Sequence, residues 1–320
     1  MQSWPGGLPP AAHERIARQR ASGVAGSLLS ASGAAAVRTV ALAPVGEVFG
    51  CVVEQLAYGG GQCGLWRAGT AWPGAAAGSF GGYTPWTSPV LTTGSDGRNA
   101  GFGSYVAAVQ QAWHGAVGRM VAEAAALGAD GVVGVRVHRE RLEGSSREFT
   151  ATGTAVRTLD GSVSPAARSA DDVWTAGCSP EEVAALIRSG WVPRGMTLGV
   201  SVSTKHEDPQ LKSQRSTWSG NTEVDGLTQL VTAARHDART QLARRAAPFR
   251  GSDVVITASS LSEFETPCGE EVDLHAEASF VGTVLAPGPM HAFRDRSDRA
   301  TTARDVTTVI PLRDLTRGPR

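Results

Sequence analysis

The sequence has little lysine, few cysteines and no long hydrophobic run. Lysine occurs only at Lys205 and Lys212, yet 30 Lys and Arg balance 30 Asp and Glu, so the formal net charge is zero. Affinity for nucleic acid depends largely on a cationic surface, so we expect no nucleic-acid partner. The most apolar early stretch, residues 24–53, is interrupted by two charged residues and a proline, so we expect no membrane span there.

The four cysteines, Cys51, Cys63, Cys178 and Cys268, are far apart and form no C-x-x-C motif. A chain of 320 residues can bury a sufficient core without disulfides, so free thiols are the expectation. The N-terminus lacks the basic segment and apolar core of a signal peptide. These features together predict a cytoplasmic globular protein.

Two segments of the chain share one pattern. Residues 44–53 and 193–202 both carry P-x-G-x-x-x-G and enter an alternating, β-branched stretch, which predicts a strand. An apolar stripe at helical spacing follows in each copy. The first stripe contains Val106, Val109, Trp113, Val117, Met120, Val121 and Ala124, and the second contains Leu227, Leu230, Val231, Ala234, Ala238 and Leu242.

Each predicted helix leads into two more strands. Gly128 and Pro248 are natural helix terminators. A G-[AS]-D turn then precedes an apolar strand at residues 128–130 and again at residues 251–253. A last strand closes each copy, at residues 149–157 and 274–285. The predicted order is therefore β-α-β-β, written twice.

The repeat divides the chain into five parts. They are an Ala-rich helical lead-in at 1–40, a first module at 41–162 with a Gly/Trp-rich insertion at 59–105, a connecting helical segment at 163–190, a second module at 191–286, and a flexible tail at 287–320. The connecting segment contains the capping box Ser179-Pro180-Glu181-Glu182. In the tail, residues 306–312 can add one short strand.

The helix end and strand at residues 124–135, followed by Gly153-Thr154-Ala155-Val156, resemble the YbjQ-like family, often called heavy-metal-binding domains. The second copy keeps less of this pattern, in residues 251–253 and 282–284. The resemblance implies an α+β fold of two tandem β-α-β-β modules of the dodecin-like kind, each a small antiparallel sheet packed on one long helix. The insertion at 59–105 replaces a compact loop of the family.

The resemblance also implies an oligomer, because family members are pentameric. Whole two-module chains cannot build a single ring of five modules. Two stacked layers of five, a ring of six or ten modules, or a pseudo-symmetric monomer all remain open. Closed symmetry is the usual rule, so we expect a homo-oligomer or a pseudo-symmetric assembly.

A metal site is one hypothesis for the second copy. Period-two spacing puts side chains on one sheet face, and a hairpin turning at residues 267–269 can bring two such rows together. Carboxylates and imidazole together bind divalent metals. The same alternation also arises on a half-exposed hairpin that binds nothing. The candidate ligands are Glu263, Glu265, Asp273, His275 and Glu277.

The Gly/Trp-rich insertion is the second candidate. Trp66, Trp72 and Trp86 can cover the module's own sheet, or they can form an interface or a small-molecule pocket. The sequence contains no nucleophile elbow, H-E-x-x-H motif or phosphate-binding loop, so we expect no enzyme. The first hypothesis is a non-catalytic assembly module that binds a protein or a small ligand, and the second is a protein that binds a divalent metal.

Overall fold

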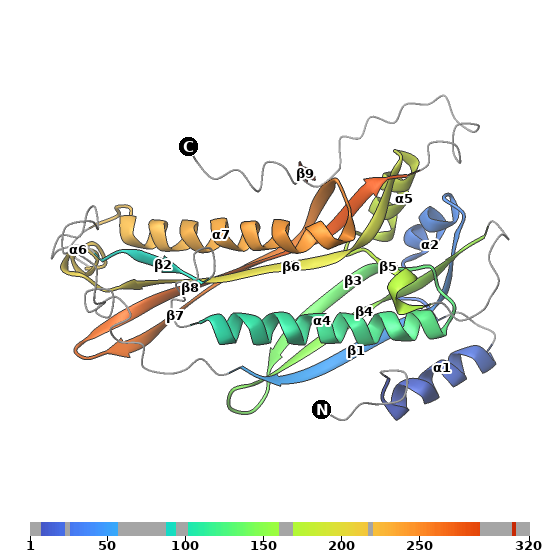
Figure 1. The fold of residues 1–320 in the computed structure, drawn as a ribbon, viewed down its shortest axis with the longest axis horizontal. Helices are drawn as coiled ribbons and strands as arrows, with labels where there is room; N and C mark the ends of the chain where they lie inside the picture. The colour runs from blue at the N-terminus through green and yellow to red at the C-terminus, as the bar shows by residue number, and fades with distance from the viewer. Residues whose placement is uncertain are drawn as a thin grey trace.

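The computed structural model describes residues 8–22, 26–56, 88–93, 102–159, 169–216 and 220–288, and the backbone of 309–311. In these residues the chain has a mixed α+β architecture with two mostly antiparallel sheets and two long helices (Figure 1). Among the described helices, none combines the length and the apolar character that crossing a bilayer requires.

The first half of the chain builds one sheet and its helix. Its elements are α1 (Pro10–Ser22), α2 (Ala31–Arg38), β1 (Leu42–Gln55), β2 (Val90–Thr92), α4 (Gly103–Ala126), β3 (Gly131–Arg141) and β4 (Ser146–Thr158). Strands β1, β4 and β3 are neighbours in that order, with β4 in the middle. We call β1, α4, β3 and β4 unit 1.

The second half repeats this arrangement. Its elements are β5 (Trp174–Thr175), α5 (Pro180–Arg188), β6 (Trp191–His206), α6 (Pro209–Gln214), α7 (Asp225–Ala246), β7 (Asp253–Cys268), β8 (Glu271–Pro287) and β9 (Val309–Pro311), with single 3-10 turns at Ala170–Asp172 and Ala247–Phe249. Strands β6, β8 and β7 are neighbours in the same order as β1, β4 and β3. We call β6, α7, β7 and β8 unit 2.

The P-x-G-x-x-x-G motif has the same structural role in both units. The register of the first strand shifts between Pro44 and Gly46 in unit 1, and between Pro193 and Gly195 in unit 2. The last glycine of each motif lies directly under the long helix. A Cβ on Gly50 would lie 2.0 Å from a backbone carbonyl oxygen of α4, and one on Gly199 would lie 2.1 Å from a carbonyl oxygen of α7. Only glycine allows this close packing of strand and helix.

The predicted helix ends are confirmed. Gly128 follows α4 with φ 71°, a left-handed conformation that glycine adopts without strain. Pro248 lies in the 3-10 turn that ends α7. In α5, the Ser179 hydroxyl accepts from the Glu182 N–H, and the Glu182 carboxylate accepts from the Ser179 N–H, which completes the predicted capping box.

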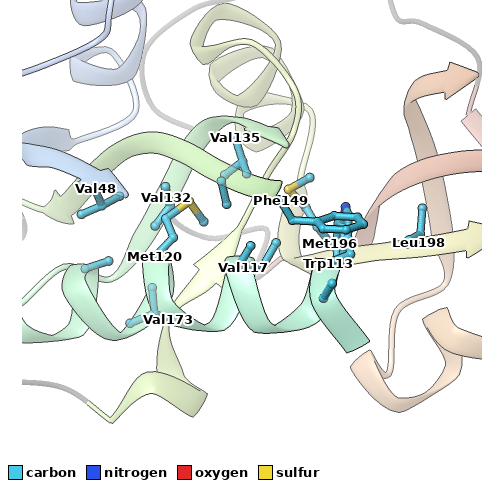
Figure 2. Close-up of a cluster of buried hydrophobic side chains, with 14 of the residues drawn as sticks. Val48, Trp113, Val117, Met120, Val132, Val135, Phe149, Val173, Met196 and Leu198 are labelled. Atoms are coloured by element: carbon cyan, nitrogen blue, oxygen red, sulfur yellow. The ribbon is translucent and has the colours of Figure 1, made fainter. Parts of the chain in front are cut away.

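Each long helix was expected to pack on the three strands of its own unit, but α4 also contacts a strand of the other unit. The stripe on α4 packs against sheet β1-β4-β3, but the same core cluster extends to β6 of unit 2. Figure 2 shows Met196 and Leu198 beside Trp113 of α4 and Phe149 of β4. Burying each aliphatic side chain of this kind contributes about 1.5–3 kcal/mol. Strand β6 therefore has α7 on one face and α4 on the other (Figure 1).

Short segments also cross between the units. Strand β2 lies inside the predicted insertion, yet it pairs with β6 at the edge of the second sheet. Strand β5 precedes unit 2, yet it pairs in parallel with β3 of unit 1. In the predicted tail, β9 pairs with the start of β7. The sequence pattern of a single module contains no sign of these exchanges.

Candidate functional site

The strongest concentration of buried polar side chains lies along β8. Asp273, His275 and Glu277 alternate on one face of the sheet, as the period-two pattern predicts, and each is at least 95% buried. This face is turned toward unit 1, whose α4 begins beside it. A row of three buried ionisable groups is costly unless each group finds partners, so their partners decide what the row can do.

The predicted convergence of two rows across the hairpin is wrong. The register pairs Phe264 with His275 and Glu263 with Ala276. Glu263 and Glu265 therefore lie on the opposite face of the sheet from Asp273, His275 and Glu277. Both are exposed, and Glu265 accepts from Arg215 Nη2 at 2.6 Å. The five predicted ligands cannot surround one ion.

His275 is held by neutral partners. Its Nδ1 lies 2.9 Å from the hydroxyl of Thr204, and its Nε2 lies 2.8 Å from the hydroxyl of Thr266. Its ring lies 4.8 Å from the rings of both Phe102 and Phe264. Burial lowers the pKa of His275 to about 4, with the nearby Asp273 acting in the opposite direction. Both ring nitrogens are occupied, so this histidine is a structural residue.

Glu277 joins the two units. Its Oε1 lies 2.7 Å from Arg139 Nη1 on β3, and its Oε2 accepts from the Tyr105 hydroxyl of α4 at 2.5 Å. Burial, followed by the charge of Glu277, raises the pKa of Tyr105 well above its usual range. The carboxylate is therefore fully used in a contact between units.

Asp273 belongs to a different cluster at the far end of the sheet. His206 ends β6, and its Nδ1 lies 2.7 Å from Asp273 Oδ1. Its Nε2 lies 2.6 Å from Oε2 of Glu271, whose side chain is 43% exposed. Each ring nitrogen of His206 is thus within hydrogen-bond distance of a different carboxylate. The buried side chain of Cys268 completes the cluster: its sulfur, one ring nitrogen of His206 and one oxygen of Asp273 all lie within 4.8 Å of one another.

The cysteines differ from the expectation of free thiols. Cys268 is disulfide-bonded, whereas Cys51 and Cys178 are free. Burial raises the pKa of both free thiols to about 11, which makes them poor nucleophiles at neutral pH. Cys63 lies outside the described residues, as do Trp66, Trp72 and Trp86, so the aromatic hypothesis remains a prediction.

No sequence motif singles out His206. The residue ends a strand in the stretch Lys205-His206-Glu207-Asp208, and no spacing motif links it to residues 67 positions later. Its neighbour Lys205 is also buried, and the Lys205 ammonium donates to the Ser88 carbonyl at 2.6 Å and to Asp208 at 3.1 Å. An abrupt polar run at the end of an apolar strand was the available signal. The pairing of His206 with Asp273 requires the register of β6 on β8.

Comparison with known proteins identifies one family segment. Residues 96–159 match the YbjQ-like family, whose description reads "Putative heavy-metal-binding". A protein of Mycobacterium tuberculosis named encapsulin nanocompartment protein Rv1762c is 41% identical over 88 residues, which are 26% of this chain and 32% of that relative. The chain thus matches about a third of the relative's length. No solved structure matches the chain significantly.

The family description can be tested against the geometry. In the described part of the matched segment, residues 102–159, no three His, Cys, Asp or Glu side chains come together as metal ligands. The cluster at His206 lies in unit 2, outside the match. The match to the YbjQ-like family model thus falls on the helix and hairpin of unit 1.

Proposed function

We propose that this chain is a non-catalytic assembly protein, made of two tandem dodecin-like β-α-β-β modules, that binds further copies of itself head to tail. The observation that carries this proposal is the strand exchange between units: the segment before unit 2 adds to the sheet of unit 1. Such an exchange within one chain is the kind of contact that separate subunits make when an extended segment adds to a sheet edge.

The likeness of the two units extends to the segments that precede them. Leu28 N–H donates to the buried hydroxyl of Thr154 at 3.1 Å, and Gly177 N–H donates to the buried hydroxyl of Thr283 at 3.0 Å. Each donor lies two residues before the serine that caps the next helix, α2 or α5. These matched details support a duplication, because unrelated modules have no reason to share them.

The segment before unit 2, residues 174–178, makes many contacts with unit 1. Backbone hydrogen bonds join Trp174 N–H to the Asp130 carbonyl and Ala176 N–H to the Val132 carbonyl. In return, β3 donates from Val135 to Ala176 and from Gly134 to Cys178. The Trp174 ring lies so close to Gly131 that a Cβ there would be 2.1 Å away. The edge of β3 is thereby closed to other strands.

The equivalent segment before unit 1, residues 26–29, is mostly exposed. Leu28 corresponds to Gly177, and it is 54% exposed, one of the most exposed large hydrophobic residues in the described part of the chain. The strand equivalent to β3 is β7, where β9 pairs with residues 253–255. We propose that residues 26–29 of one copy dock on the β7 edge of the next, displacing β9. The M. tuberculosis relative, by its name, belongs to a nanocompartment, which agrees with an assembling role.

Native mass spectrometry of the full chain tests this proposal. The expected result is a defined oligomer of the wild-type chain that Leu28→Asp dissociates. Leu142→Asp is the matched control, because Leu142 is 44% exposed at the β3–β4 turn and has no part in the docking segment. A wild-type chain that stays monomeric at micromolar concentration, or an oligomer that Leu28→Asp leaves intact, would overturn the proposal.

A further inference from the structure

A cluster of three metal-ligating residue types lies at the end of the unit 2 sheet. His206 ends β6, Cys268 ends β7, and Asp273 lies near the start of β8. Their exposed fractions are 6%, 5% and 2%. Imidazole nitrogen, thiolate sulfur and carboxylate oxygen together form a donor set that suits Zn²⁺ or Cd²⁺. The three residues meet only because the three strands are in register at this end.

We propose that His206, Cys268 and Asp273 form a redox-gated site for Zn²⁺, closed while Cys268 is in its disulfide and opened by reduction. A disulfide sulfur is a poor ligand, whereas a thiolate is among the best for Zn²⁺. This inference does not depend on the proposed assembly function, because it concerns a different end of the sheet.

The chemistry of the switch balances. A dithiol reductant supplies two electrons and two protons, the S–S bond at Cys268 breaks, two thiols form, and the dithiol becomes a cyclic disulfide. When Zn²⁺ binds, the Cys268 thiol gives up its proton to solvent, and His206 coordinates through a ring nitrogen that carries no proton. Metal binding therefore requires prior reduction of the disulfide.

The geometry needs only a small adjustment. Ligand atoms around tetrahedral Zn²⁺ lie roughly 3.3–3.8 Å apart. The three atoms here lie within 4.8 Å, so the site must contract by about 1 Å. Glu271, whose carboxylate lies 2.6 Å from the Nε2 of His206, can orient the ring or supply an oxygen as the fourth ligand.

The site is particular to unit 2. Counting from the matched glycines Gly50 and Gly199, His206 corresponds to residue 57, beyond the end of β1 at Gln55. Counting back from Gly153 and Gly282, Asp273 corresponds to Gly144, which lies in the β3–β4 turn with φ 61°. The strands of unit 2 are longer, and their added length carries the cluster. The proposed site is therefore not a feature of the segment that matches the family.

Titration of the full chain with Co²⁺, a spectroscopic substitute for Zn²⁺, tests the proposal. After reduction with a phosphine and desalting, we expect one equivalent of Co²⁺ to bind with a thiolate-to-cobalt charge-transfer band that one equivalent of Zn²⁺ abolishes. The oxidised chain should show no such band. A reduced, folded wild-type chain without the band would overturn the proposal.

Variants separate this site from adventitious binding. His206→Gln and Asp273→Asn should each weaken Co²⁺ binding at least tenfold, as loss of one ligand does, and Cys268→Ser should remove the band. The matched controls are Cys178→Ser and His236→Gln, which should bind as the wild type does. A band that survives in His206→Gln and in Cys268→Ser would place the metal elsewhere. If Cys268→Ser fails to fold, the His206 and Asp273 variants still decide the question.

Discussion

Substituting alanine for Gly199 is the sharpest test of how the repeated motif works. The new Cβ would lie 2.1 Å from the Ala238 carbonyl oxygen and 2.6 Å from the Leu242 amide nitrogen, both atoms of the α7 backbone. Ordinary van der Waals contact begins at 3.4 Å, so the helix and strand must separate by about 1.3 Å. A backbone cannot swing aside as a flexible side chain can, so the whole helix has to move.

The expected magnitude follows from what that movement disturbs. The face of α7 toward the sheet contains Leu230, Ala234, Ala238, Leu242 and Ala246, all no more than 1% exposed. A radial gap of about 1 Å forfeits up to about half of the dispersion energy of such contacts. Overpacking of this kind costs roughly 1–3 kcal/mol or more, against a gain of at most about 1 kcal/mol from a stiffer unfolded chain. We therefore expect Gly199→Ala to lower the unfolding free energy by about 1–2 kcal/mol.

Urea unfolding followed by far-ultraviolet circular dichroism measures this change. Gly50→Ala should behave alike, because its Cβ would lie 2.0 Å from the Ala116 carbonyl oxygen of α4. Gly118→Ala is the control: that glycine lies within α4 with nothing within 4 Å of a new Cβ, so the substitution should stabilise by about 0.5–1 kcal/mol. If Gly199→Ala unfolds within about 0.5 kcal/mol of the wild type, the close-packing explanation of the motif is refuted.

Two further predictions concern buried carboxylates. Glu277→Ala should cost about 2–3 kcal/mol in urea unfolding, because it removes the carboxylate that pairs with Arg139. Glu263→Ala on the exposed face should change stability by less than about 0.5 kcal/mol, and equal effects of the two substitutions would contradict the assignment of faces. Burial raises the pKa of Asp237, so ionisation above that pKa destabilises the fold, and stability is regained as pH falls through it. Asp237→Asn should therefore raise the urea midpoint at pH 7 and lose this advantage near pH 3.5. The control, Asp225→Asn at an exposed position, should give no gain at pH 7. A gain in Asp237→Asn that does not depend on pH would exclude the ionisation mechanism.

The cluster at the end of the unit 2 sheet combines residues that sequence reasoning treated separately. The face of the sheet on which Asp273 lies was predicted correctly, but the other predicted ligands do not surround it. Its real neighbours are His206 from β6 and Cys268 from β7. His275, the expected imidazole ligand, is instead bonded at both nitrogens by threonine hydroxyls. A pattern along one strand indicates which side chains share a face, but it does not identify which strand lies opposite.

Local features of this protein were determined by the sequence alone. The order β-α-β-β in each half, the stop at Gly128, the capping box at Ser179 and the shared face of Asp273, His275 and Glu277 were all predicted and are all present. Each depends on residues within a few positions of one another, where backbone geometry and side-chain period leave little choice.

The tertiary structure alone decided the rest. Residue alternation cannot reveal that Phe264 lies opposite His275, because a slip of one residue in register reverses every side chain of a strand. Nor can it show that β2 and β5 pair with the sheet of the other unit. These outcomes depend on contacts between segments up to 172 residues apart, such as the hydrogen bond of Tyr105 with Glu277. Such contacts form only when whole units pack together, so no short stretch of sequence contains them.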